Sequence, residues 1–175
     1  MLRRKFLLNL TLYIVLSGYP LNGLALPEDT TQPIRIMADS AVRDDKQGLT
    51  TYSGNVTMNQ GSMNITANNI TIHSSGENVN TIVAKGTPAR FTQKQKNGAT
   101  PVIASGTIIE YYKNKELIHI RQQATIEQNN STVKSEDIQY YINEQVVKAN
   151  SGKNNQSGRV EVVIPPRQNN EENTN

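Results

Sequence analysis

Side chains that could carry catalysis or bind a metal are few in this chain of 175 residues. His73 and His119 are the two histidines, and neither has a second histidine at the spacing of metal ligands. We expect them at strand ends or on a solvent-exposed face, so the sequence predicts no metal site. The absence of cysteine excludes thiol nucleophiles, disulfides, thiolate zinc sites and lipidation at cysteine.

The carboxylates, like the histidines, do not indicate a catalytic site. Asp44 and Asp45 lie in a charged, turn-like stretch, and Asp39 and Asp137 precede or lie within strand-like segments, where bonds to turns or backbone are expected. Glycoside hydrolysis needs two carboxylates at a defined separation, which a sequence does not supply. We find neither a nucleophile elbow nor a phosphate loop. We predict no catalytic residue and no cofactor, with an enzyme such as a sugar hydrolase as an alternative.

The formal charge of +3 comes from the first five residues. Without Arg3, Arg4 and Lys5, the chain has 15 basic and 15 acidic side chains. Binding to nucleic-acid phosphates needs clustered lysine and arginine, so no nucleic-acid partner is predicted.

Residues 1–25 have the three parts of a secretory signal peptide. The basic start precedes an apolar run from Phe6 to Leu16, and Gly23 and Ala25 supply the small residues of a cleavage site. The alternative, a transmembrane anchor, needs about 20 apolar residues, and this run has 11. We therefore expect cleavage after Ala25 and a mature chain outside the cytoplasm.

The composition after residue 25 favours β-structure. It has 15 Ile and 11 Val against 3 Leu, and β-branched side chains pack well on pleated sheets. Short alternating segments such as Val56–Met58 and Ile118–Ile120 are separated by turn residues such as Asn129-Asn130. We predict an all-β fold of many short antiparallel strands arranged as a sandwich, barrel or roll.

A repeat inside the chain predicts how these strands bend. Apolar or small residues recur at offsets 0, 2, 5 and 7 in three copies that begin at Ile65, Ala104 and Val133, with a weaker copy at Ile36. The first two offsets and the last two have opposite parity, so a flat strand would place them on opposite faces. A bulge near Gly106, or near Asn68 and Asn69 in the first full copy, would bring both pairs into one interior.

Two other β-architectures compete with this interpretation. A structural or adhesive β-solenoid would need a fixed repeat period, but the full copies start 39 and 29 residues apart. An outer-membrane barrel would need strands of about nine to eleven residues and aromatic girdles. The segments here look shorter and aromatic residues are few.

Five motifs in a characteristic order connect the chain to a known family. They are Gln32-Pro33-Ile34-Arg35-Ile36, Tyr52-Ser53-Gly54-Asn55-Val56-Thr57-Met58-Asn59-Gln60-Gly61, Ile65-Thr66-Ala67, Gly86-Thr87-Pro88-Ala89-Arg90-Phe91 and Asp137-Ile138-Gln139-Tyr140. With these motifs the chain resembles the LptA (OstA) family of periplasmic lipopolysaccharide-transport proteins over roughly residues 32–164. It departs at Gln122-Gln123, where the family tends to repeat a Gly-Asn turn.

The resemblance implies a non-enzymatic, open-ended β-jellyroll with an apolar interior, over residues 33–166. Residues 26–32 would be an N-terminal segment, and residues 167–175 a disordered polar tail. The implied role is to carry lipopolysaccharide, bound by its lipid A part, through the periplasm. The implied partners are inner-membrane and outer-membrane transport proteins that share the fold, together with further copies joined head to tail.

An acyl-chain carrier needs a continuous apolar trough, because exposing each buried CH₂ costs about 0.8 kcal/mol. Isoleucine and valine can line one without interlocking as bulky aromatics do. Each candidate could equally be an ordinary core residue. The candidate lipid contacts are Ile34, Ile36, Val56, Ile70, Phe91, Ile109, Ile120, Ile126 and Ile138.

Both ends of the predicted roll carry strands with few blocking charges. The first, Ile34 to Ala38, follows Pro33, and the last, Arg159 to Ile164, stops at Pro165. We predict strand addition between the C-terminal end of one copy and the N-terminal end of another. The alternative is pairing within the domain only. The candidate edge residues are Ile34, Ile36, Val160, Val162 and Ile164.

Overall fold

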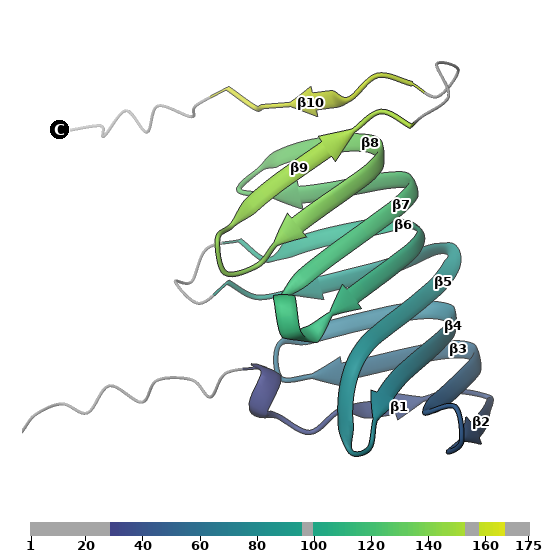
Figure 1. The fold of residues 1–175 in the computed structure, drawn as a ribbon. Coiled ribbons are helices and arrows are strands. Elements are labelled where there is room, and N and C mark those ends of the chain that lie inside the picture. Colours follow the sequence, from purple (N-terminus) through teal and green to yellow (C-terminus); the bar gives the residue numbers. More distant parts are fainter. Residues whose placement is uncertain (1–28, 96–99, 153–157, 167–175) are drawn as a thin grey trace, which may run out of the picture.

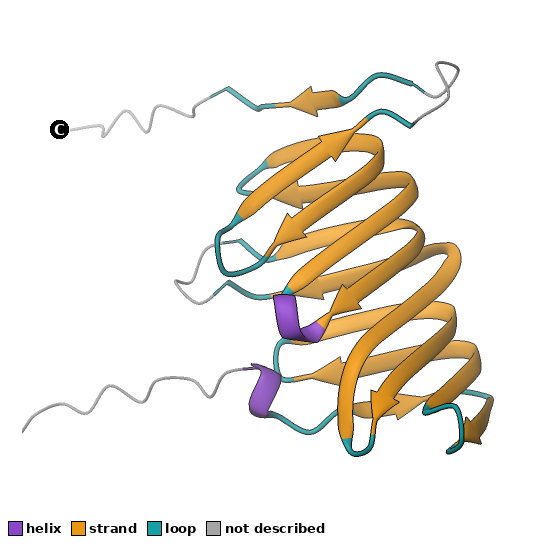
Figure 2. Cartoon of the chain, in the orientation of Figure 1, coloured by secondary structure: helices purple, strands orange, loops and turns teal. Residues whose placement is uncertain are grey.

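The computed structural model describes residues 29–95, 100–152 and 158–166, and these are almost entirely β-strand (Figures 1 and 2). The predicted signal peptide, residues 26–28 of the predicted N-terminal segment and the predicted tail lie outside the described residues. One 3₁₀ turn, η1 (Asp29–Thr31), precedes the first strand, and another, η2 (Lys113–Lys115), connects two later strands. The strands are β1 (Arg35–Met37), β2 (Ser40–Asp44), β3 (Leu49–Gln60), β4 (Met63–Ser75), β5 (Asn78–Gln93), β6 (Val102–Tyr112), β7 (Leu117–Gln128), β8 (Ser131–Tyr141), β9 (Val146–Asn150) and β10 (Glu161–Val163).

All pairings are antiparallel, and neighbours in sequence are mostly neighbours in the sheet. The order is β1-β3-β4-β5-β6-β7-β8-β10, with β2 also on β3 and β9 also on β8. The edge strands β1 and β10 are shorter than predicted, so Ile34, Val160 and Ile164 flank the pairing instead of taking part in it. The all-β prediction is confirmed, but the expected short strands are not: β3–β8 have 11–16 residues each, because each continues through a bend.

The long strands bend midway and form two layers. Register shifts fall at Ser53/Val56 in β3, Thr66/Asn69 in β4, Lys85/Ala89 in β5, Ser105/Ile108 in β6 and Arg121/Ala124 in β7. Figure 1 shows these strands curving back at the right of the view. Layer 1 comprises β1, β10 and residues 56–60, 63–66, 89–93, 102–105, 124–128 and 131–135. Layer 2 comprises β2, β9 and residues 49–53, 69–75, 81–85, 108–112, 117–121 and 137–141.

The bend is built from left-handed or side-chain-free residues. Gly54 and Asn55 have φ values of 80° and 43°, and Gln122 and Gln123 take the corresponding conformation in β7 with φ values of 62° and 56°. At Gly106, an added Cβ would lie 2.6 Å from Cγ2 of Ile120. Glycine there lets neighbouring strands approach closely where they turn.

The repeated residues line one interior, as their offsets predicted. Ile65 lies in layer 1, Ile70 and Ile72 lie in layer 2, and all three are buried. The third copy repeats this arrangement with a partly buried Val133 and with buried Ile138 and Tyr140. The parity change at each bend therefore turns both halves of a strand toward one core.

That core lies between the two layers and is almost wholly apolar. Its one buried polar residue among those described is Gln60. No helix in the described part of the chain is long and apolar enough to cross a membrane. The buried apolar residues are Val56, Met58, Met63, Ile65, Ile70, Ile72, Ile82, Ala84, Ala89, Phe91, Val102, Ala104, Ile109, Tyr111, Ile118, Ile120, Ala124, Ile126, Ile138 and Tyr140.

Candidate functional site

Two unbroken rows of apolar side chains cross the molecule at right angles to the strands. The register makes consecutive members cross-strand partners, so each row runs from one open edge of the sheet to the other. The row of layer 1 is Ile36, Met58, Ile65, Phe91, Ala104, Ile126, Val133 and Val162. The row of layer 2 is Ala41, Tyr52, Ile70, Ala84, Ile109, Ile120, Ile138 and Ala149.

The predicted lipid contacts fall on or beside these rows. Seven of the nine are buried, with at most 1 % of their surface exposed. Val56 lies one step nearer the bend, and Ile34 and Ile36 pack against the core at the N-terminal edge. The rows contain seven of the nine, namely Ile36, Ile70, Phe91, Ile109, Ile120, Ile126 and Ile138.

The prediction omitted interior residues that its own repeat would have supplied. Ile65 and Val133 occupy offset 0, and Ile72, Tyr111 and Tyr140 occupy offset 7. All of them face the interior. The repeat offset is therefore a better guide to the lining than apolar residue type alone.

At the tips of the layers, opposite the bend, the interior becomes polar. Three alternate strands of layer 1 end their inner faces with glutamine: Gln60, Gln93 and Gln128. Across from them, layer 2 presents Tyr111 and Tyr140. We call this region the mouth.

Hydrogen bonds cross the mouth directly. The amide Nε2 of Gln128 donates to the hydroxyl of Tyr140 at 3.4 Å, and Nε2 of Gln145 donates to Oε1 of Gln95 at 3.3 Å. Tyr140 follows Ser131, the strand partner of Gln128, by nine residues, which is roughly 30 Å in a flat strand. The contact therefore exists because the layers fold back on each other.

The hydroxyls at the mouth are held neutral. Burial raises the pKa of Tyr111 to about 12, and the negative charges of Glu116 and Asp29 add to the rise. Burial also raises the pKa of Tyr140, and its hydrogen bond with Gln128 partly offsets that rise. Both phenols are thus donors as well as acceptors at physiological pH.

The N-terminal segment closes part of the mouth. The Asp29 carboxylate accepts hydrogen bonds from the Ser62 backbone N–H at 2.7 Å, the Ser62 hydroxyl at 2.6 Å and Nε2 of Gln93 at 2.8 Å. Nε2 of Gln60 donates to the Gln32 carbonyl at 2.9 Å. These bonds fasten η1 across the turn between β3 and β4.

The histidines and the aspartates take structural positions. His73 is exposed near the end of β4, as expected. His119 lies mid-strand on the outer face of layer 2, with Nε2 2.6 Å from Asp137 and Nδ1 3.5 Å from Glu110. Glu110 also pairs with Arg121 at 2.5 Å. The expected turn or backbone role of Asp137 was therefore wrong, because its strand neighbour presents a histidine to it.

Asp39 behaves as expected. Its backbone N–H donates to the carbonyls of Ser53 and Gly54 at 3.1 Å, and its carboxylate accepts a 3.4 Å bond from Asn55 at the bend. Asp44 likewise accepts two backbone N–H bonds in its turn. Within the described ranges, no group of three His, Asp or Glu side chains could hold a metal ion.

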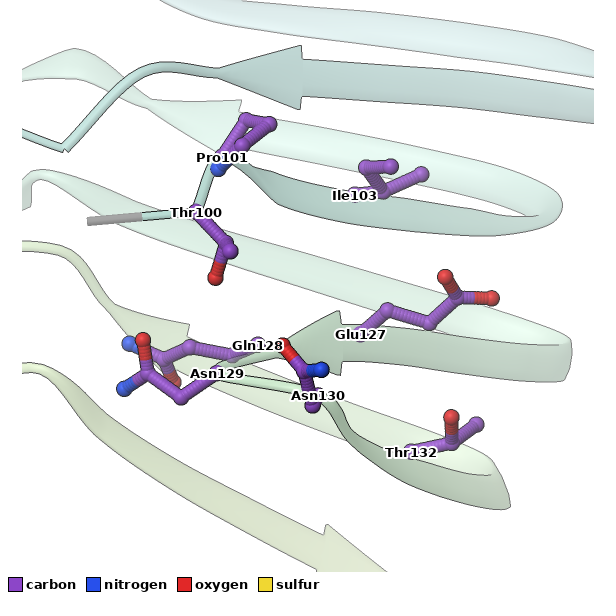
Figure 3. A pocket seen from close by; sticks show the side chains of 8 residues that line it. All are labelled: Thr100, Pro101, Ile103, Glu127, Gln128, Asn129, Asn130 and Thr132. Carbon is purple, nitrogen blue, oxygen red and sulfur yellow. The ribbon is translucent and has the colours of Figure 1, made fainter. Parts of the chain in front are cut away.

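A shallow depression of about 270 Å³ lies on the outer side of layer 1 (Figure 3). Its walls are Ile103 and Pro101 with the polar side chains of Thr100, Glu127 and Thr132, near the Gln128–Asn130 turn. It is separated from both apolar rows by the sheet itself, because Ile103 and Glu127 point away from the interior.

Comparison with known proteins shows which family has this architecture. Residues 35–146 match the family described as "LptA/(LptD N-terminal domain) LPS transport protein", a match that runs from β1 to the first residue of β9. The chain belongs to this family. The matched range includes both layers and every bend, so the family resemblance read from the motifs is confirmed.

Individual members of the family agree with the match. The chain is 34 % identical over 150 residues to the lipopolysaccharide export system protein LptH of Pseudomonas aeruginosa, covering 83 % of this chain and 86 % of the relative. It is 32 % identical over 166 residues to LptA of Escherichia coli K12, covering 94 % and 88 %.

A solved structure of LptH, described as the LptA-homologous periplasmic component of the lipopolysaccharide transport device of P. aeruginosa, superposes with a TM-score of 0.74 at 34 % identity. It covers 80 % of this chain and 100 % of that one. The two chains therefore share the bent-strand fold, and the names of these relatives describe transport and not catalysis.

Proposed function

We propose that this protein is a periplasmic lipopolysaccharide carrier. It shelters the lipid A acyl chains between its two layers and bridges the inner-membrane transporter and the outer-membrane assembly complex. The observation that carries the proposal is the pair of apolar rows that run without a polar interruption from the β1–β2 edge to the β9–β10 edge. Membership in a transport family supports it.

The rows suit an acyl chain energetically. Each CH₂ taken from water contributes about 0.8 kcal/mol, so several long chains cannot cross an aqueous space unsheltered. The space between the layers is filled by the protein's own side chains, including Phe91 with 0 % exposure. Lipid therefore replaces side-chain contacts between the layers, and the layers part at the mouth, which is held by a few hydrogen bonds.

The edges support end-to-end assembly. Val162 and Ile164 at the C-terminal edge are 54 % and 75 % exposed, and Met37 at the N-terminal edge is 64 % exposed. β10 pairs with β8 on one side only, and β1 pairs with β3 on one side only. Adding the β1 edge of a second copy, or of a partner with the same fold, to the β10 edge would join the row of one molecule to the row of the next.

Site-specific photo-cross-linking in intact cells tests the proposal. A photo-reactive residue at Ile36 or Phe91 should form lipopolysaccharide adducts, whereas one at Thr57, on the outer face of layer 1, should not. Thermal unfolding of each purified variant checks that it folds. Adducts at none of the three positions in folded protein would contradict lipid carriage and favour a structural β-repeat protein that shares only the fold.

A further inference from the structure

The mouth contains polar side chains that are not needed merely to close an apolar core. Gln128 lies two residues beyond Ile126, and Tyr140 lies two residues beyond Ile138, on the same inner faces. The polar groups therefore stand about 7 Å from the apolar rows along the strands. Gln93 has the same relation to Phe91, and Tyr111 has it to Ile109.

These four side chains are neutral and can both donate and accept hydrogen bonds. Among them there is no lysine or arginine, and the charges that raise the pKa of Tyr111 are the carboxylates of Glu116 and Asp29. Phosphate is bound by cations or clustered N–H groups, so this row is a poor phosphate site. Hydroxyl and amide groups of a sugar match it, because each of them can also donate and accept.

We propose that Gln93, Gln128, Tyr111 and Tyr140 form a binding row for the sugar hydroxyls and amides of a glycolipid whose acyl chains lie between the layers. The proposal rests on the proposed function and names the part of the ligand that meets the mouth. In the closed molecule, Gln128 donates to Tyr140 within the row, and Gln93 donates to Asp29 beside it. When lipid enters, the same groups exchange these bonds for bonds to the sugar.

The exchange explains why polar groups sit at this depth. An apolar rim would close the core more tightly, since burying an amide or hydroxyl contributes little net stability even when it is hydrogen-bonded. A rim of amides and phenols can instead exchange its own hydrogen bonds for bonds to an incoming headgroup that is rich in hydrogen-bonding groups.

The outer face of β8 supplies matched controls. Tyr141 donates to Gln139 at 3.2 Å, so it is a tyrosine–glutamine pair like Tyr140 and Gln128, but it faces away from the interior. The test variants are Gln128→Leu and Tyr140→Phe, and the controls are Gln139→Leu and Tyr141→Phe. Urea unfolding of all four establishes that they are folded.

Affinity is measured for two probes, purified lipopolysaccharide and a fluorescent fatty acid that has an acyl chain and no sugar. The readout is the ratio of the two affinities, because any easier opening of the mouth acts on both probes alike. Each test variant should lower the preference for lipopolysaccharide by about 3- to 10-fold, the loss of one hydrogen bond. The controls should leave the ratio within twofold of wild type.

The outcomes separate the two proposals. Wild-type protein that binds lipopolysaccharide, together with test variants that keep its ratio, would overturn the sugar-binding row. If a test variant raises both affinities by the same factor, the sugar-binding row is also contradicted. The polar residues of the mouth would then only hold the two layers together. Wild-type protein that binds neither probe would contradict the carrier function itself.

Discussion

Gln122 and Gln123 occupy a conformation that suits glycine or asparagine better. Their φ values of 62° and 56° are left-handed, and the matching bend in β3 uses Gly54 and Asn55. A left-handed residue with a side chain costs about 1–2 kcal/mol, against about 0.5–1 kcal/mol of extra unfolded-state entropy for glycine. The family-like Gly-Asn motif is therefore absent from the sequence while its geometry is kept.

Gln122→Gly should raise the free energy of unfolding by about 0.5–1 kcal/mol, because it removes this strain and both side chains here are exposed. Urea denaturation measures the change. Thr125→Gly, in a regular stretch of the same strand, should lower stability instead. A loss of stability in Gln122→Gly would show that the bend depends on the glutamine side chain.

Tyr111 makes stability depend on alkaline pH. Its folded pKa of about 12 exceeds the unfolded value of 10.0, so the contribution is complete below pH 10 and is lost as pH rises toward 12. The wild-type protein should lose on the order of 2 kcal/mol of unfolding free energy over this window from Tyr111 alone. Tyr111→Phe should flatten that part of the curve measured by urea denaturation at successive pH values. Equal losses in both proteins would mean that Tyr111 does not ionise with unfolding.

At the scale of strands, most of what could be predicted about the fold came from the repeat. The parity change between Ile65 and Ile70 requires a bend, since both residues are apolar and a flat strand would expose one of them. The edges were less predictable, because β1 and β10 are short and alternation in Arg159–Ile164 runs past the paired Glu161–Val163.

The polar contacts could not be predicted from the sequence, for a physical reason. Gln128 meets Tyr140, and Gln95 meets Gln145, only because folded-back layers bring distant tips together. His119 meets Asp137 through a register offset of two residues, which no pattern along one strand reports. Apolar periodicity describes which face is buried, and it says little about which polar partners meet there.

The edge strands should control assembly independently of each other. Ile36→Pro should block pairing at the N-terminal edge and Val162→Pro at the C-terminal edge, because proline removes a backbone donor and is tolerated at sheet edges. A heterologous head-to-tail interface needs one edge of each type. Under the proposed head-to-tail assembly, wild-type protein should form chains and each variant alone should stay monomeric at the same concentration.

Mixing the two variants tests the geometry of the joint. One intact C-terminal edge and one intact N-terminal edge remain in the mixture, so sedimentation should show a dimer and nothing larger. Thermal unfolding of each variant serves as a check on the fold. Chains formed by either variant alone would contradict pairing between β1 and β10.

At the scale of the molecule, two routes lead to the apolar rows. A lipid could pass along the rows through the open edges, or it could enter sideways where the tips of the layers separate. The bend is continuous backbone and cannot open, whereas the tips are joined by side chains such as Gln95 and Gln145, 3.3 Å apart. Because layer-to-layer contacts fill the space, sideways entry requires the tips to move.

Tethering the tips should therefore slow lipid uptake. The chain has no native cysteine, so Gln95→Cys with Gln145→Cys can be joined by a short bismaleimide without side reactions at other thiols. The tethered protein should take up lipopolysaccharide at least about tenfold more slowly than the same variant before treatment. Gln139→Cys with Lys148→Cys, cross-strand partners in layer 2, is the control, because a tether within one layer leaves the mouth free. If the uptake rate is unchanged with the tips tethered, the lipid travels through the open edges. The hydrogen bonds of the mouth then stay intact during loading.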